Sequence, residues 1–188
     1  MIASGETRLS SMTMRRMPVL AQSQAVPVVD ANGNPVLGVN PDGSITPMLA
    51  PASLPPSYYA QSGELASAMD DSSVSNGEAG LSVPAGLAEF YPGGPLDAQR
   101  FNGQFFGQFT AYSNYAFGIY TSAAGLSLDD ALAGANAVAG LANYPPNFPR
   151  GGNSNYPNLL NSNYTNIVNG YGAYASGGVC PSNACGGP

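Results

Sequence analysis

Two helical patterns that meet at Gly125 constrain the fold of this 188-residue chain more than any other feature. The first predicts a helix over about residues 104–124, because apolar residues recur there every three or four positions. The residues on this apolar face are Phe105, Phe109, Tyr112, Ala116, Ile119 and Ala123. Gly125 follows the last of them, at the position where a glycine typically ends a helix.

The second pattern predicts a helix that begins after Ser127. A serine is a favourable N-cap, and the two acids in the first turn, Asp129 and Asp130, suit the positive end of the helix dipole. The apolar stripe of this helix consists of Leu128, Leu132, Ala135 and Ala139. Because Gly118 and Ser122 of the first helix are small, we expect the two helices to cross at short distance. The sequence therefore predicts an antiparallel helix pair hinged at a glycine.

The remainder of the chain predicts a mainly α fold in three parts: an arm over 1–55, a small helical domain over 56–175 and a cysteine-containing tail over 176–188. Prolines spaced along the arm exclude a long helix, among them Pro18, Pro27, Pro35, Pro41, Pro47 and Pro51. Asn-Gly and Asp-Gly pairs in the arm favour a small hairpin with type I′ turns, and an extended arm lying on another protein is an equal alternative.

Three further helices are expected within the helical domain. The first follows Pro56 and is expected to place Tyr58, Leu65 and Met69 on one face. The second has Pro84 near its first position and ends at Pro92. A short helix over about 157–174 is expected to pack on the central pair.

Composition narrows the functions that are open to the chain. Only 9% of its residues are charged, the net charge is −6, and histidine is absent. This composition argues against a nucleic-acid-binding surface built on bulk positive potential, although a nucleic acid remains open as a substrate. Without histidine there is no Ser-His or Cys-His catalytic pair, and the sequence predicts neither a metal nor a cofactor. No apolar stretch is long enough to span a membrane.

The two cysteines, Cys180 and Cys185, lie in the tail with four residues between them. They are suited to close a small disulfide loop in an oxidising compartment, and two reduced thiols in a frayed tail are an equal alternative.

Three polar residues are the candidate site: Asp97, Arg100 and Asn114. Asp97 follows the Pro-Gly-Gly-Pro segment 92–95 and precedes Arg100 by three positions, which suits a carboxylate held beside a cation at the edge of a cleft. The alternative is a helix cap with a surface ion pair. Asn114 lies among aromatic residues inside a predicted helix, where asparagine is unfavourable, so it has either a ligand to bind or a core partner to satisfy.

The same residues resemble the polymorphic toxin type 44 domain family of bacteria, over about residues 88–175. Gly93, Gly94, Pro95 and Asp97 correspond to the family's Gly-Gly-Pro-Trp-Asp segment, with Leu96 in place of tryptophan and Arg100 loosely in place of a following lysine. A second group of matches lies in the helix pair: Asn114, Tyr115, Gly118, Ala123 and Gly125. The segment near residue 170 is similar to the family's closing motif.

The chain departs from the family at positions that bear on chemistry. Ala116 stands where the family often has asparagine or histidine. Asparagines replace the acids expected near 155–165, at Asn155, Asn158, Asn161 and Asn163.

The resemblance implies a secreted antibacterial effector, delivered by a larger protein or a secretion apparatus and neutralised by an immunity protein. It implies a hydrolase, with RNA as the first candidate substrate, in which Asp97 acts on the substrate, Arg100 binds an anionic group and Asn114 hydrogen-bonds a polar atom. A non-enzymatic structural or interaction module of an exported assembly is the alternative, because the chain has few ionisable groups and a C-terminal third rich in Asn, Tyr and Gly.

Overall fold

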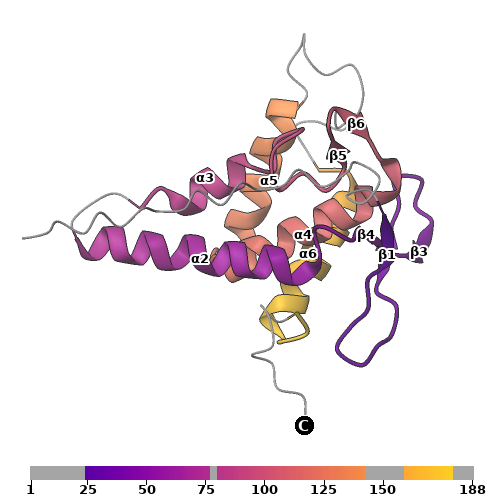
Figure 1. Ribbon diagram of the computed structural model, residues 1–188, viewed down its shortest axis with the longest axis horizontal. Helices are drawn as coiled ribbons and strands as arrows, with labels where there is room; N and C mark the ends of the chain where they lie inside the picture. The colour runs from indigo at the N-terminus through magenta and orange to yellow at the C-terminus, as the bar shows by residue number, and fades with distance from the viewer. Residues whose placement is uncertain (1–23, 77–79, 143–158, 180–188) are drawn as a thin grey trace, which may run out of the picture.

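The computed structural model describes residues 24–76, 80–142 and 159–179, and the predicted cysteine loop lies outside them. The described part is mainly α-helical, as the sequence predicts, and it also contains short antiparallel strand pairs (Figure 1). Its helices are α2 (Pro56–Ser75), α3 (Ser82–Ala88), α4 (Thr110–Ala123), α5 (Leu128–Ala142) and α6 (Asn161–Ala175), and a 3₁₀ turn, η1 (Gly107–Phe109), precedes α4. Its strands are β1 (Ala25–Pro27), β2 (Leu37–Val39), β3 (Ile45–Pro47), β4 (Leu49–Pro51), β5 (Arg100–Phe101) and β6 (Gln104–Phe105).

Helix α4 forms the centre of the core, and ten of its residues are buried. A helix that is apolar on most sides has to be enclosed by its neighbours. The buried side chains of η1 and α4 include the predicted face from Phe109 to Ala123. Phe105, the first residue of that predicted face, lies instead in β6 and is 44% exposed. The difference arises because Asn102 and Gly103 have φ angles of 50° and 79°, which form a hairpin turn between β5 and β6.

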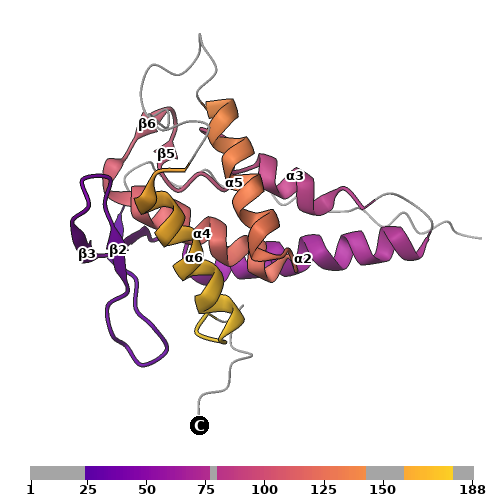
Figure 2. The same cartoon turned by 180° about the vertical axis from the view of Figure 1, so that it is seen from behind.

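Close helix crossings involve α4 with α2 and α6. A Cβ atom added to Gly118 would lie 2.1 Å from the carbonyl oxygen of Ile167 in α6, and one added to Gly63 of α2 would lie 2.4 Å from that of Tyr120. By contrast, the nearest atom to a Cβ at Gly134 of α5 is 3.4 Å away. The predicted close pair of α4 and α5 is therefore not confirmed. Figure 2 shows α6 crossing α4.

Gly125 and Ser127 have the local roles that the sequence predicts. Gly125 adopts a φ of +76° directly after α4, where a left-handed residue ends a helix. The hydroxyl of Ser127 accepts a hydrogen bond from the Asp130 N–H at 3.1 Å, so Ser127 caps the N-terminus of α5.

The segment before α2 is folded into the domain. Strand β1 pairs with β4, and β2 pairs with β3, in antiparallel register. Val28, Met48 and Ala50 are buried in the core. Of the two interpretations of this segment, the hairpin is confirmed over residues 24–51 and the extended arm is not.

The hairpin turns differ from the expected type. Gly33 and Gly43 have φ angles of +82° and +84°, and the residues before them do not share the positive φ that a type I′ turn needs at both central positions. The N–H groups of Gly33 and Gly43 donate to the carbonyls of Asp30 and Asn40 three residues earlier, and each glycine then returns the chain to its strand.

Helix α2 begins at Pro56 as predicted, but the apolar face predicted for it is wrong. Tyr58, Leu65 and Met69 are exposed, Leu65 to 62%. The buried residues are Tyr59, Ala60, Gly63 and Ala66, most of which are small. The close approach to α4 selects small residues over large ones. None of the helices in the described part of the chain is long and apolar enough to cross a membrane.

Candidate functional site

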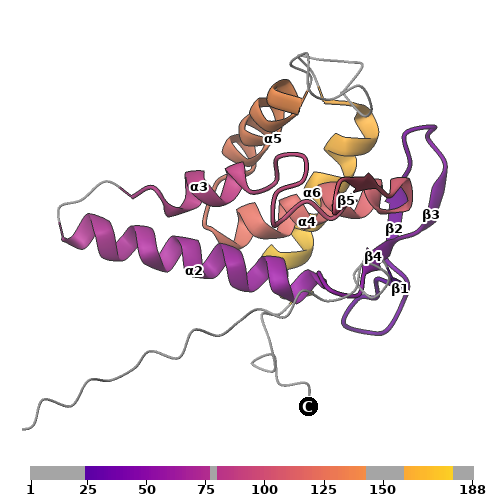
Figure 3. The same cartoon turned by 45° about the horizontal axis from the view of Figure 1, so that its top comes forward.

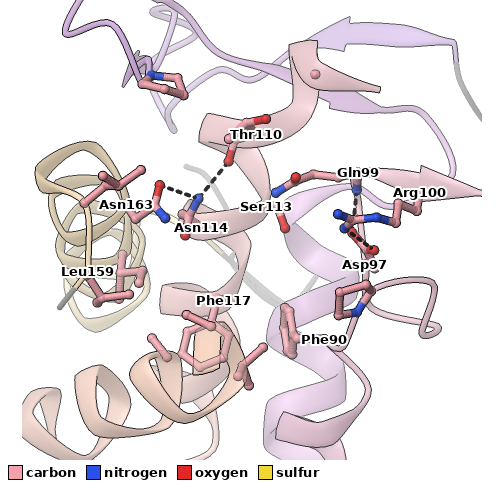
Figure 4. A pocket seen from close by; sticks show the side chains of 18 of the residues that line it. Phe90, Asp97, Gln99, Arg100, Thr110, Ser113, Asn114, Phe117, Leu159 and Asn163 are labelled. Carbon is pink, nitrogen blue, oxygen red and sulfur yellow. Dashed lines mark hydrogen bonds and ion pairs between the residues drawn. The ribbon is translucent and has the colours of Figure 1, made fainter. Parts of the chain in front are cut away.

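A pocket of about 480 Å³ opens where α4, α5 and α6 meet the loop after α3 and the β5–β6 hairpin (Figure 4). Figure 3 shows the ribbons of α4, α5 and α6 from a third side. Asp97, Arg100 and Asn114 all line it. The three residues that the sequence singles out, from two separate segments, therefore share one pocket. The volume is within the range of small-molecule sites.

The Pro-Gly-Gly-Pro segment shapes the backbone around Asp97. Gly93 has a φ of +84°, which favours glycine, and a Cβ at Gly94 would lie 2.2 Å from the carbonyl oxygen of Glu89. The Gly94 N–H donates to the Tyr91 carbonyl at 2.7 Å. This tight turn returns the chain so that the N–H of Gly93 faces the Asp97 carboxylate.

Asp97 is 3% exposed and accepts three hydrogen bonds. Oδ2 accepts from the Gly93 N–H at 2.8 Å and from Arg100 Nη1 at 3.0 Å, and Oδ1 accepts from the Gln99 N–H at 2.9 Å. The ion pair is thus mostly buried rather than a surface pair. Asp97 fixes both the loop and the position of Arg100.

Arg100 is held on two sides. Its guanidinium pairs with Asp97 and lies over the ring of Phe105, 5.1 Å from the ring centroid. The Asn102-Gly103 turn makes this stacking possible, because it places β6 beside β5. The Arg100 side chain keeps 16% of its exposure.

Asn114 links α4 to α6. Its Nδ2 donates to the Thr110 carbonyl at 2.9 Å and to Asn163 Oδ1 at 3.3 Å. Both N–H groups of the side-chain amide are engaged, so Oδ1 is the atom left to accept a hydrogen bond from a ligand. Asn114 thus has structural partners and also lines the pocket, so the two alternatives for it are compatible.

Reasoning from the sequence assigned no site role to the other lining residues, and it noted Asn163 only as a replacement for an expected acid. Gln99, Ser113 and Asn163 add polar groups, and an apolar floor consists of Phe90, Phe117, Val138, Leu159 and Ile167. Figure 4 shows Arg100 and Gln99 on one side of the pocket, and Asn114 and Asn163 on the other. Two signals were available: the Asn-Gly pair after Arg100, and the spacing of Ser113, Asn114 and Phe117 on one side of a helix.

The pocket offers little acid–base chemistry. Asp97 and Arg100 are the only ionisable side chains among the described residues that line it. In the described ranges, no group of three His, Cys, Asp or Glu residues is placed to hold a metal ion. Beside the pocket, burial and, to a smaller extent, the Asp97 charge raise the pKa of Tyr59 well above its usual value.

The positions where the chain departs from the toxin family have different surroundings. Ala116 is fully buried in the core and is not a lining residue, whereas Asn163 lines the pocket. Asn161 is exposed, and Asn155 and Asn158 lie outside the described residues. Comparisons with protein families, with characterised proteins and with solved structures give no match to this chain.

Proposed function

We propose that this chain is a secreted bacterial effector domain of the toxin type and that its substrate binds in the pocket around Arg100. The observation that supports the proposal is the convergence of Asp97, Arg100 and Asn114 on one pocket. These residues carry the resemblance and are 17 positions apart at most, yet they belong to a loop, a strand and a helix. The same proposal includes delivery of the domain by a secretion apparatus and its neutralisation by an immunity protein.

The proposed reaction is a hydrolysis, with RNA as the substrate that the resemblance suggests. Arg100 neutralises an anionic group, and Asn114 Oδ1 accepts a hydrogen bond from a polar group of the substrate. Asp97 acts as the reacting carboxylate. Its Oδ1 accepts one hydrogen bond, from Gln99, which leaves a lone pair for a proton from the substrate or from water.

Expression inside bacteria tests this proposal. We expect the wild-type chain to arrest growth, and Asp97→Asn and Arg100→Gln to relieve the arrest. Asp71→Asn is the matched control, because Asp71 is exposed on α2 and does not line the pocket. Thermal unfolding of each purified variant separates loss of activity from loss of fold. Equal growth with the wild type, Asp97→Asn and empty vector would remove the basis for a toxin.

A second candidate function is a non-enzymatic interaction module of an exported assembly. It is favoured by the ion pair between Asp97 and Arg100, which are the ionisable groups among the described lining residues. It is also favoured by the exposed apolar residues of α2, which are suited to contact another protein. Co-purification with a secretion-apparatus protein in the absence of toxicity would support this function over the first.

A further inference from the structure

The cation of the pocket is presented in a fixed orientation. Arg100 has five N–H groups, and the Asp97 carboxylate accepts from one of them, on Nη1. Phe105 covers one face of the guanidinium. Because the side chain remains 16% exposed, further N–H groups can reach a ligand in the pocket. A planar guanidinium held in this way is suited to bind a carboxylate or phosphate group.

The other described residues that line the pocket are uncharged. Its floor is apolar, and Phe90 and Phe117 meet there edge to face with their ring centroids 4.9 Å apart. On the side away from Arg100, the amides of Asn114 and Asn163 bond to each other. A ligand that fills this space needs an apolar body and one anionic end.

The charge of the whole chain opposes a polyanion. It has eleven acidic and five basic residues, for a net charge of −6. A polymer with many phosphates would be repelled by the protein as a whole, because affinity for a nucleic acid depends on many phosphate contacts with Lys and Arg. A ligand with a single anionic group needs only Arg100.

We infer that the pocket binds a compact amphiphile with one anionic group, a carboxylate or a phosphate monoester, on Arg100 and an apolar or aromatic body over Phe90 and Phe117. The inference rests on the proposed site, and it replaces RNA with a small singly anionic molecule as the ligand of that site. A volume of about 480 Å³ suits such a molecule.

Binding of small probes to the full-length protein tests this inference. The probes are 3-phenylpropionate, phenyl phosphate, the neutral 3-phenylpropionamide, and a uridine oligonucleotide as the polyanion. Dissociation constants are measured by calorimetry, and NMR shifts of the Asn and Gln side-chain amides locate the site. We expect an anionic probe to bind roughly tenfold or more tightly than the neutral amide, as is typical of one charge-assisted hydrogen bond. The two anionic probes distinguish a carboxylate from a phosphate ligand.

Variants at the cation give a second readout. Arg100→Gln leaves the buried Asp97 carboxylate without its charged partner and is expected to destabilise the fold. The double variant Asp97→Asn/Arg100→Gln avoids this problem because it removes both charges together. We expect the double variant to bind the anionic and neutral probes equally. Arg100→Lys keeps the charge without the planar fork and is expected to be intermediate.

The outcomes separate this inference from the proposed function. Equal binding of 3-phenylpropionate and its amide to the wild type, or tighter binding of the oligonucleotide than of either small anion, would overturn the inference. An unchanged preference for anions in the double variant would also overturn it. Toxicity that depends on Arg100 without binding of the small anions leaves the proposed function in place and removes the inference. Anion binding without toxicity supports the inference and removes the basis for the toxin proposal.

Discussion

Asn166 takes the place of a neighbouring strand along one edge of β2. Its Oδ1 accepts from the Val39 N–H at 3.0 Å, and its Nδ2 donates to the Val39 carbonyl at 2.8 Å. The side chain is buried, with 1% exposure, so it is shielded from water. A primary amide has a carbonyl oxygen that accepts hydrogen bonds and an NH₂ group that donates them, so it can pair with both the N–H and the C=O of one residue.

We expect Asn166→Ala to lower the free energy of unfolding by about 1–3 kcal/mol, because it leaves the polar backbone groups of Val39 without partners. Asn169→Ala is the matched control on the exposed side of the same helix, with an expected effect within about 0.5 kcal/mol. Chemical denaturation measures both. Equal stability of the two variants would show that water replaces the amide at no cost.

The surroundings of Asp97 could be predicted from the sequence only in part. Two prolines and two glycines before it predict a tight turn, and an arginine three positions later predicts an ion pair, and both are present. The partners Gly93 N–H and Gln99 N–H depend on the exact turn geometry, which residue types alone do not determine. The neighbours Val138 and Asn163 come from distant helices, so their part in the pocket could not be predicted from spacing.

At the scale of elements, the existence of the helices was predictable and their contacts were not. Periodicity predicted α2, but it selected large apolar residues for the buried face, whereas contact with α4 requires Gly63, Ala60 and Ala66. The helix predicted over 104–124 begins later, because the Asn-Gly turn competes with helix formation at its start. Tertiary packing and turn chemistry therefore overrode local patterns in these two places.

The crossing of α4 and α6 yields a pair of glycine substitutions with effects of opposite sign. A Cβ at Gly170 would lie 1.9 Å from the Tyr115 carbonyl oxygen, whereas a Cβ at Gly172 has no atom within 4 Å. We expect Gly170→Ala to destabilise the fold by roughly 1–3 kcal/mol or more, because the helices must separate. Gly172→Ala is expected to stabilise it by up to about 1 kcal/mol through helix propensity.

Thermal and chemical unfolding of both alanine variants measure this difference. Both substitutions add the same methyl group to the same helix, so propensity cancels in the comparison. A Gly170→Ala protein as stable as Gly172→Ala would contradict the close crossing of α4 and α6.

At the scale of the whole molecule, we expect buried and partly buried tyrosines to govern the response to alkaline pH. Burial raises the pKa of Tyr120 to about 12, and burial together with a hydrogen bond to the Glu64 carboxylate raises that of Tyr174 to about 12. Burial also raises the pKa of Tyr112 well above its usual value. An unfolded tyrosine has a pKa of about 10. The stabilisation is therefore complete below pH of about 10 and is lost as the pH rises through about 12.

We expect the free energy of unfolding to fall steeply between pH of about 10 and 12. The absorbance of tyrosinate should appear over the same pH range. Tyr174→Phe should flatten this dependence, because it removes one of the shifted groups. Denaturant titrations at a series of pH values measure the slope. A titration of all tyrosines near pH 10 in the folded protein would contradict their burial.

The hydrogen bonds between Asn166 and Val39 also have a consequence for folding during synthesis. The two residues are 127 positions apart, and contacts between distant positions form late. A ribosome releases β2 long before it makes α6, so the strand waits with one edge uncovered while most of the chain is synthesised. The described core is complete only when α6 has been made, and a chain truncated before α6 is expected to remain unfolded.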